Sequence, residues 1–217
     1  MKTKKLLFYL LAALLGGCIP VMSLHPLYTE KDVVFEEKLL GVWESDSNDT
    51  SNTTWEFKHP EKAKKAKKAY ELVFSDKEGG KGMFIAHLVK LENKLFLDVY
   101  PAELPCGPSE DPNNIEWLYN VFFLVPAHTF IKINAIEPQL KMQLTSEDEI
   151  EELLKEDPNA MRYESFEDDR LVLTASTKKL QEFVLKYADD DRVFTDETAL
   201  TRKKTEDPNE PNSKCLK

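Results

Sequence analysis

Short runs of alternating apolar and polar residues recur along the chain and predict a protein built mainly from antiparallel strands. Residues 53–58 place Trp55 and Phe57 on one face at a period of two, and residues 139–144 alternate in the same way. Other segments rich in β-branched and aromatic residues have strand length and are bounded by turn residues. They lie at 41–44, 70–74, 128–133, 171–174 and 198–203.

One pair of apolar segments predicts a hairpin with a defined register. Residues 83–91 and 94–100 are separated only by Glu92 and Asn93. An even loop sets His87 opposite Asp98, and a histidine–carboxylate pair on an apolar face can bind a ligand or tune a proton. A structural ion pair or a core hydrogen bond is the alternative. The same face is expected to carry Ile85, Val89, Phe96 and Tyr100.

Helical spacing is confined to two late segments and one early turn. Ser146 and Glu149 form a capping box ahead of an apolar stripe. A second helix should begin at Ser176 or Thr177, because its apolar residues fall at i, i+3, i+4 and i+7. These residues are Leu180, Phe183, Val184 and Tyr187. A short helical turn is expected within 33–40, which makes two to three short helices in a mostly β chain.

The first eighteen residues have the pattern of a secretory leader. Lysines at positions 2, 4 and 5 precede an apolar run over 6–15 that is too short to span a bilayer. The ending Leu15-Gly16-Gly17-Cys18 resembles the lipobox of bacterial lipoproteins. That resemblance implies cleavage before Cys18, acylation of Cys18 and export, and Ile19 resembles the pattern of lipoproteins sent to the outer membrane. An ordinary signal peptide with an accidental cysteine is the alternative.

This leader sets the expected organisation and localisation. We expect a signal peptide at 1–17, a lipidated tether at 18–30, a β-barrel-like domain at 31–204 and a disordered tail at 205–217. The protein should be anchored by acylated Cys18 in the bacterial cell envelope, facing the periplasm from the outer membrane.

The chain has a net charge of −10, and without the three leader lysines it has 26 basic and 39 acidic residues. Such an acidic domain is not expected to bind nucleic acid.

The sequence contains few groups arranged for catalysis. It lacks a Gly-x-Ser-x-Gly elbow, a P-loop, a Cys-x-x-Cys pair and a His-Glu-x-x-His zinc motif. Its four histidines fall in four separate segments, so no metal or cofactor is indicated. Cys106 and Cys215 can form a disulfide in an oxidising envelope or remain two free thiols.

A family resemblance begins at Gly41-Val42-Trp43. A helical turn, a Gly-x-Trp strand and an antiparallel meander resemble the start of lipocalin-like barrels, in which an arginine of the last strand packs over the tryptophan. Arg202 is suitably placed, so the resemblance implies a structural Trp43–Arg202 contact. It also implies an up-and-down β-barrel or a strongly curved sheet, and the predicted segments supply eight to nine strands by count. Residues 25–32, 40–43 and 86–90 are also similar to uncharacterised bacterial lipoproteins, a resemblance that implies no function.

Three functional hypotheses follow. The first is a membrane-tethered binding module for a small apolar or amphipathic ligand, with His87, Asp98, Phe96, Tyr100 and Ile85 lining its cavity. The second is a structural envelope lipoprotein, or one that binds a protein partner, with a filled barrel. The third, an enzyme using His87 and Asp98, lacks a nucleophile or a metal, and we expect no enzymatic activity.

Overall fold

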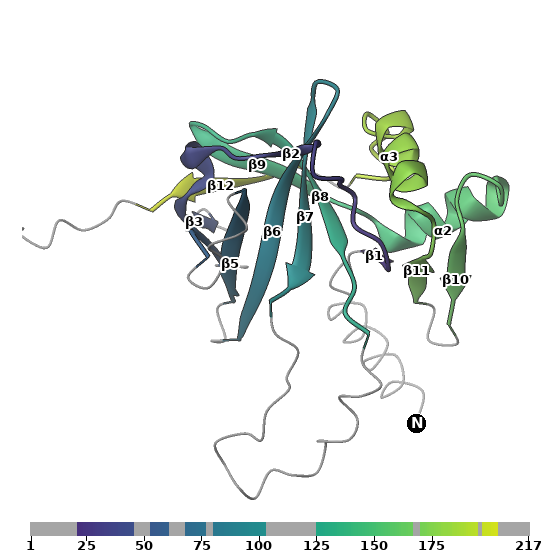
Figure 1. Cartoon of the computed structure of the whole chain (residues 1–217), viewed down its shortest axis with the longest axis horizontal. Helices are drawn as coiled ribbons and strands as arrows, with labels where there is room; N and C mark the ends of the chain where they lie inside the picture. Colours follow the sequence, from purple (N-terminus) through teal and green to yellow (C-terminus); the bar gives the residue numbers. More distant parts are fainter. Residues whose placement is uncertain are drawn as a thin grey trace, which may run out of the picture.

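The computed structural model describes residues 21–45, 53–60, 68–76, 80–102, 125–166, 170–194 and 197–203. Within these ranges, eight antiparallel strands form a closed barrel in which each strand pairs with the next along the chain, and the last pairs with the first (Figure 1). The strands are β3 (Gly41–Ser45), β4 (Thr54–Lys58), β5 (Ala69–Ser75), β6 (Lys81–Leu91), β7 (Lys94–Pro101), β8 (Thr129–Ala135), β9 (Gln139–Leu144) and β12 (Thr198–Arg202). The predicted up-and-down barrel is confirmed.

A ninth strand lies outside this closed barrel. β6 is eleven residues long, and β5 pairs only with its first seven residues. The short strand β2 (Val33–Val34) pairs with the next two, Leu88 and Val89, along the same edge. The expected helical turn within 33–40 is therefore wrong for Val33 and Val34, which form a strand. The helical part is the 3₁₀ turn η1 (Glu37–Leu39).

A second group of elements packs on the outside of the barrel, and we call it the outer layer. It contains the three-stranded sheet of β1 (Met22–Ser23), β11 (Leu171–Leu173) and β10 (Tyr163–Ser165), together with α2 (Glu147–Glu156) and α3 (Thr177–Lys186). Except for β1, these elements come between β9 and β12 in the chain, and Figure 1 shows them beside the barrel. No helix in the described part of the chain is long and apolar enough to cross a membrane.

Both helices follow from local sequence signals. The Ser146 side chain accepts a hydrogen bond from the Glu149 amide at the start of α2, as the capping box predicts. The predicted apolar stripe of α3 is buried at Leu180, Phe183 and Val184. The buried stripe turns each helix toward the barrel, because only that face is apolar.

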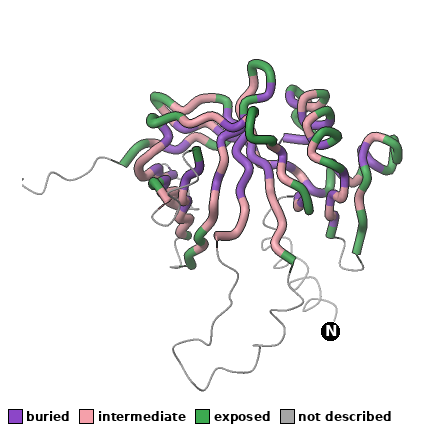
Figure 2. The backbone as a smooth tube through the Cα atoms, in the orientation of Figure 1, coloured by how far each residue is buried: buried purple, intermediate pink, exposed green. Residues whose placement is uncertain are grey.

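The barrel strands separate two apolar cores. Inward-facing side chains from all eight strands form the interior core, which is centred on Trp43, Phe57 and Tyr70. Outward-facing residues of β6, β7 and β8 join the outer layer in a second core, which includes Phe96 and Phe130. Figure 2 shows buried residues along the central strands, which contribute side chains to both cores. One wall of the barrel is therefore apolar on both faces.

Candidate functional site

The Gly-x-Trp corner has the contact that the lipocalin-like resemblance implies. The guanidinium carbon of Arg202 lies 4.2 Å from the centre of the Trp43 ring. Its Nη1 and Nη2 donate hydrogen bonds of 2.5 Å to the carbonyl oxygens of Leu40 and Lys38. Gly41 has a φ of +119°, and a Cβ there would lie 2.6 Å from Arg202 Nη1, so a glycine fits this position best. Arg202 thus fixes η1 to the last strand.

The predicted register of the hairpin formed by β6 and β7 is confirmed, with His87 opposite Asp98. The face that this pair occupies differs from the expectation. Inward positions on the two strands are taken by Ala86, Leu88, Leu97 and Val99, so the alternate residues point outward. The expectation that Ile85, Phe96 and Tyr100 line a cavity inside the barrel is therefore wrong, and all three lie on the outer face with the pair.

Asp98 is fully buried and binds groups other than His87. Its Oδ2 accepts a hydrogen bond of 2.6 Å from the Leu27 amide. Its Oδ1 lies 2.6 Å from Nδ1 of His128, a distance at which an imidazole N–H donates to a carboxylate. The sequence had indicated the wrong histidine, because the partner, His128, directly precedes β8 rather than lying in the hairpin of β6 and β7. Asp98 joins the N-terminal segment to the barrel wall.

Two tyrosines pack against the histidines of this cluster. The Tyr28 ring lies 4.3 Å from that of His87, and the Tyr100 ring lies 4.6 Å from that of His128, measured between ring centres. Nδ1 of His87 is buried and has no hydrogen-bond partner among the residues that the structure describes. Burial lowers the pKa of His87, and nearby Asp98 opposes this shift. Burial also raises the pKa of Tyr28. Burial therefore favours the neutral form of the His87 imidazole.

The N-terminal segment is bound to the domain from residue 21 onward. Val21 and Leu27 are buried, and Ser23 exchanges two backbone hydrogen bonds of 2.8 Å with His128. Gln181 of α3 donates to the carbonyl oxygen of Leu27 at 2.8 Å. The expected tether over 18–30 is therefore wrong for residues 21–30, and the folded domain begins before residue 31. Apolar residues spaced at Val21 and Leu27 were too few to reveal this from the sequence.

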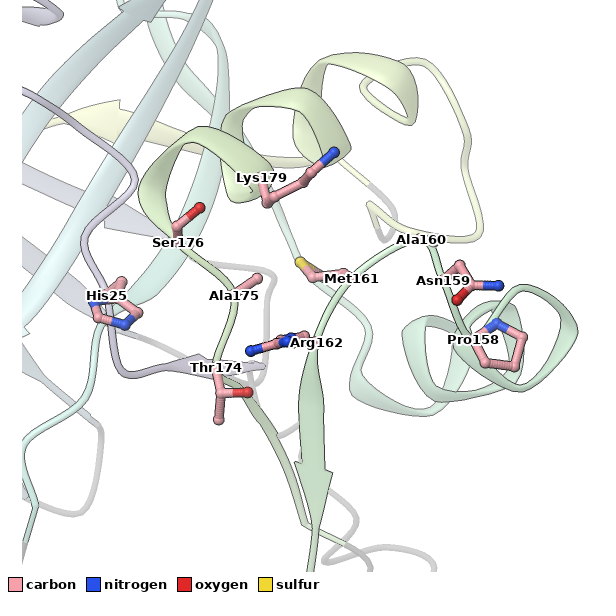
Figure 3. A pocket seen from close by; sticks show the side chains of 10 residues that line it. All are labelled: His25, Pro158, Asn159, Ala160, Met161, Arg162, Thr174, Ala175, Ser176 and Lys179. Atoms are coloured by element: carbon pink, nitrogen blue, oxygen red, sulfur yellow. The ribbon is translucent and has the colours of Figure 1, made fainter.

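A pocket of about 510 Å³ lies in the outer layer, between the segment after α2, the start of α3 and the N-terminal segment (Figure 3). No sequence pattern indicated this pocket, because its walls come from three separate stretches of the chain. The volume is in the range of small-molecule sites. Its lining comprises His25, Pro158, Asn159, Ala160, Met161, Arg162, Thr174, Ala175, Ser176 and Lys179.

Several predicted residues lie outside the described ranges. These include the lipidation residue Cys18 and both members of the possible disulfide, Cys106 and Cys215, as well as the leader and the tail over 205–217. Among the residues that are described, no three His, Cys, Asp or Glu side chains are grouped so that they could hold a metal ion.

The chain matches no protein-family model, no curated protein and no solved structure. A functional assignment must therefore be argued from the buried cluster around Asp98 and from the pocket in the outer layer.

Proposed function

We propose that this protein is a lipid-anchored protein of the bacterial cell envelope that binds a small amphipathic ligand. The pocket in the outer layer is the observation that carries this proposal. Its volume of about 510 Å³ suits a small molecule, and its lining combines apolar groups such as Met161 and Ala175 with polar ones such as Arg162. The pocket, rather than the barrel interior, is the proposed binding site.

The lipobox-like segment supports the anchor, and the packing of residue 21 makes that anchor short. Cys18 is three residues from Val21, whose amide donates a 3.3 Å hydrogen bond to Thr145 Oγ1. Three residues of extended chain reach at most about 11 Å. An acylated Cys18 would hold the domain, and with it the pocket, close to the membrane surface.

The interior core favours a second function, a structural or partner-binding lipoprotein with a filled barrel. Trp43 and Tyr70 are fully buried inside the barrel, and Phe57 is 2% exposed. Side chains of this size fill much of the space within a small barrel. Under this alternative the barrel would be a scaffold, and the protein would purify without a bound molecule.

Native mass spectrometry of the full-length protein, purified from its own envelope, separates these two functions. We expect the wild-type protein to retain a small molecule. Ala160→Trp, which fills the pocket, should lose it, whereas the matched control Ala160→Ser should keep it. Circular dichroism would verify that both variants are folded. A wild-type protein that retains nothing, or an Ala160→Trp variant that retains the same molecule, would contradict binding in the pocket.

The anchor is tested separately by Cys18→Ala. We expect the wild-type protein to carry the additional mass of acyl chains on its N-terminal peptide and to sediment with membranes. The variant should lack that mass, because it has no thiol to acylate. An unmodified wild-type N-terminus would disprove lipid anchoring without affecting the pocket.

A further inference from the structure

We propose that the pocket in the outer layer selects an anion, namely the carboxylate or phosphate head of an amphipathic ligand, and that Arg162 is the main residue that binds it. This inference rests on the proposed function, because it names the chemical class of ligand for the same pocket. It depends on the charges that line the cavity and on the partners that those charges have.

The charge of the lining is opposite to that of the protein. The chain has 39 acidic residues and a net charge of −10, yet none of the ten lining residues is Asp or Glu. Arg162 and Lys179 are both in the lining, and His25 is a third nitrogen base. Asp157, next to the lining, accepts a 3.3 Å hydrogen bond from the Asn159 amide. The lining itself is therefore cationic, although the protein as a whole is acidic.

Arg162 is held by its backbone while its side chain is available. Its carbonyl oxygen accepts a 3.0 Å hydrogen bond from the Thr174 amide, which joins two walls of the pocket. Within the part of the chain that the structure describes, its guanidinium has no hydrogen-bond or ion-pair partner. A guanidinium presents paired N–H groups that match the oxygens of a carboxylate or phosphate.

Two further groups add to the positive field. Lys179 Nζ lies 2.7 Å from Glu182 Oε2, but both side chains are largely exposed and the pair is weak. Ser176 is the N-cap of α3, and its side chain makes no capping hydrogen bond. The first intrahelical hydrogen bond runs from the Leu180 amide to the Ser176 carbonyl. The amides of residues 177–179 therefore have no partner within the helix and can donate hydrogen bonds to an anion near the pocket.

The remaining walls explain why the ligand should also have an apolar part. Met161 and Ala175 are buried, and together with Pro158 and Ala160 they give the cavity an apolar side (Figure 3). A volume of about 510 Å³ exceeds what a bare phosphate needs. A short alkyl phosphate or carboxylate matches both features, and an anionic lipid headgroup or a soluble metabolite could supply this chemistry.

Calorimetric titration of the full-length lipidated protein in phosphatidylcholine nanodiscs tests the anion preference. The probes are hexyl phosphate, hexanoate, inorganic phosphate and 1-hexanol, used below their aggregation concentrations. We expect hexyl phosphate to bind at least tenfold more tightly than 1-hexanol, because only the former has a charged head for Arg162. Inorganic phosphate, which lacks the apolar part, should bind more weakly than hexyl phosphate.

Arg162→Gln should weaken hexyl phosphate binding at least tenfold, and Arg162→Lys should restore part of the affinity. Arg170→Gln is the matched control, since it removes the same charge from an exposed arginine of the outer layer that is not in the pocket lining. We expect it to change the affinity less than twofold. Equal losses in Arg162→Gln and Arg170→Gln would overturn the assignment of Arg162.

The outcomes also separate this inference from the proposed function. Equal binding of 1-hexanol and hexyl phosphate would leave a ligand pocket but overturn its anion selectivity. Failure of all probes, with no molecule retained by the native protein, would overturn both. Native mass spectrometry of the protein from phosphatidylglycerol nanodiscs identifies the source of the anion. If a lipid headgroup binds, the wild-type protein should retain a lipid that Arg162→Gln loses. Hexyl phosphate binding without a retained lipid would indicate a soluble ligand.

Discussion

The barrel interior and the outer layer are both apolar cores of this chain, but they are assembled in different ways. The interior forms from strands that pair with their neighbours along the chain. The outer layer joins distant segments, as when Leu27 contacts Asp98, 71 residues away, and Gln181, 154 residues away. Most of these strands can align with a neighbour close in the chain, and only β12 must close the barrel on β3 and β9 over a long distance in sequence. The outer layer depends on long-range contacts throughout.

Their buried polar groups differ accordingly. Among the described residues, four of the six buried polar residues belong to the outer layer or contact it, namely Ser23, Asp98, Thr145 and Glu147. The other two, Ser45 and Gln143, lie on the barrel strands β3 and β9. The Leu171 amide, for example, donates to the Glu147 carboxylate and ties β11 to α2. Polar contacts of this kind are directional and fix how segments are placed. These contacts support the proposal that the barrel is a scaffold and that the outer layer positions the binding pocket.

The largest expected effect comes from breaking the interior core. Trp43→Ala removes a fully buried ring and its contact with Arg202, and should lower the free energy of unfolding by about 3–5 kcal/mol. Because the outer layer packs on the barrel wall, both regions should unfold together in denaturant titrations followed by circular dichroism. Trp43→Phe, which keeps an aromatic ring, is the control and should lose less. Retention of a folded outer layer in Trp43→Ala would contradict the scaffold role.

An intermediate effect is expected from loosening the outer layer alone. Asp98→Asn removes the charge that binds the Leu27 amide and His128, and should cost about 2–3 kcal/mol. Hydrogen exchange should accelerate at residues 21–32 while the barrel strands remain protected. Asp191→Asn is the control, because it removes the same charge from an exposed carboxylate outside the 21–32 segment, and it should cost less than about 1 kcal/mol. Equal acceleration in the barrel strands would show that the two regions are not separable.

The smallest effect is a pH dependence at the wall between the regions. The pKa of His87 lies below its ordinary value of 6.5 because the imidazole is buried, with Asp98 opposing and His128 reinforcing the shift. As the pH falls through 6.5, the unfolded chain binds a proton that the folded chain does not, so stability decreases toward acidic pH. One proton contributes at most about 1.4 kcal/mol per pH unit.

His87→Phe should remove that contribution while preserving the aromatic contact with Tyr28. The measurement compares the free energies of unfolding of the two proteins at pH 7.5 and pH 5. We expect the wild-type protein to lose more stability than the variant over this interval. An identical loss in both would mean that burial does not shift the pKa of His87.

Much of the barrel could be predicted because its signals are local. The two-residue turn at Glu92 and Asn93 fixed the register that set His87 opposite Asp98, and this pairing is confirmed. The capping box at Ser146 located α2 in the same way. The contact of Arg202 with Trp43 was expected from the lipocalin-like resemblance rather than from spacing.

The site was harder to predict because its contacts are not local. β8 follows β7 only after a long intervening segment, so no turn length indicated that His128, and not His87, would bind Asp98. The alternation of residues along β6 did not indicate which face lies inside the barrel, because both faces of the strand carry apolar residues. The two-residue strand β1 is too short for a periodic signal.

By itself, the sequence determined the eight barrel strands and the register of the hairpin at Glu92 and Asn93, because alternation and short turns act between neighbours in the chain. The tertiary structure decided which face of β6 and β7 is covered, how the segment from Val21 onward is bound to the barrel, and where a pocket forms. Those features depend on side chains such as His25, Arg162 and Lys179 meeting from separate segments. Only the closing of the outer layer over the barrel brings them together.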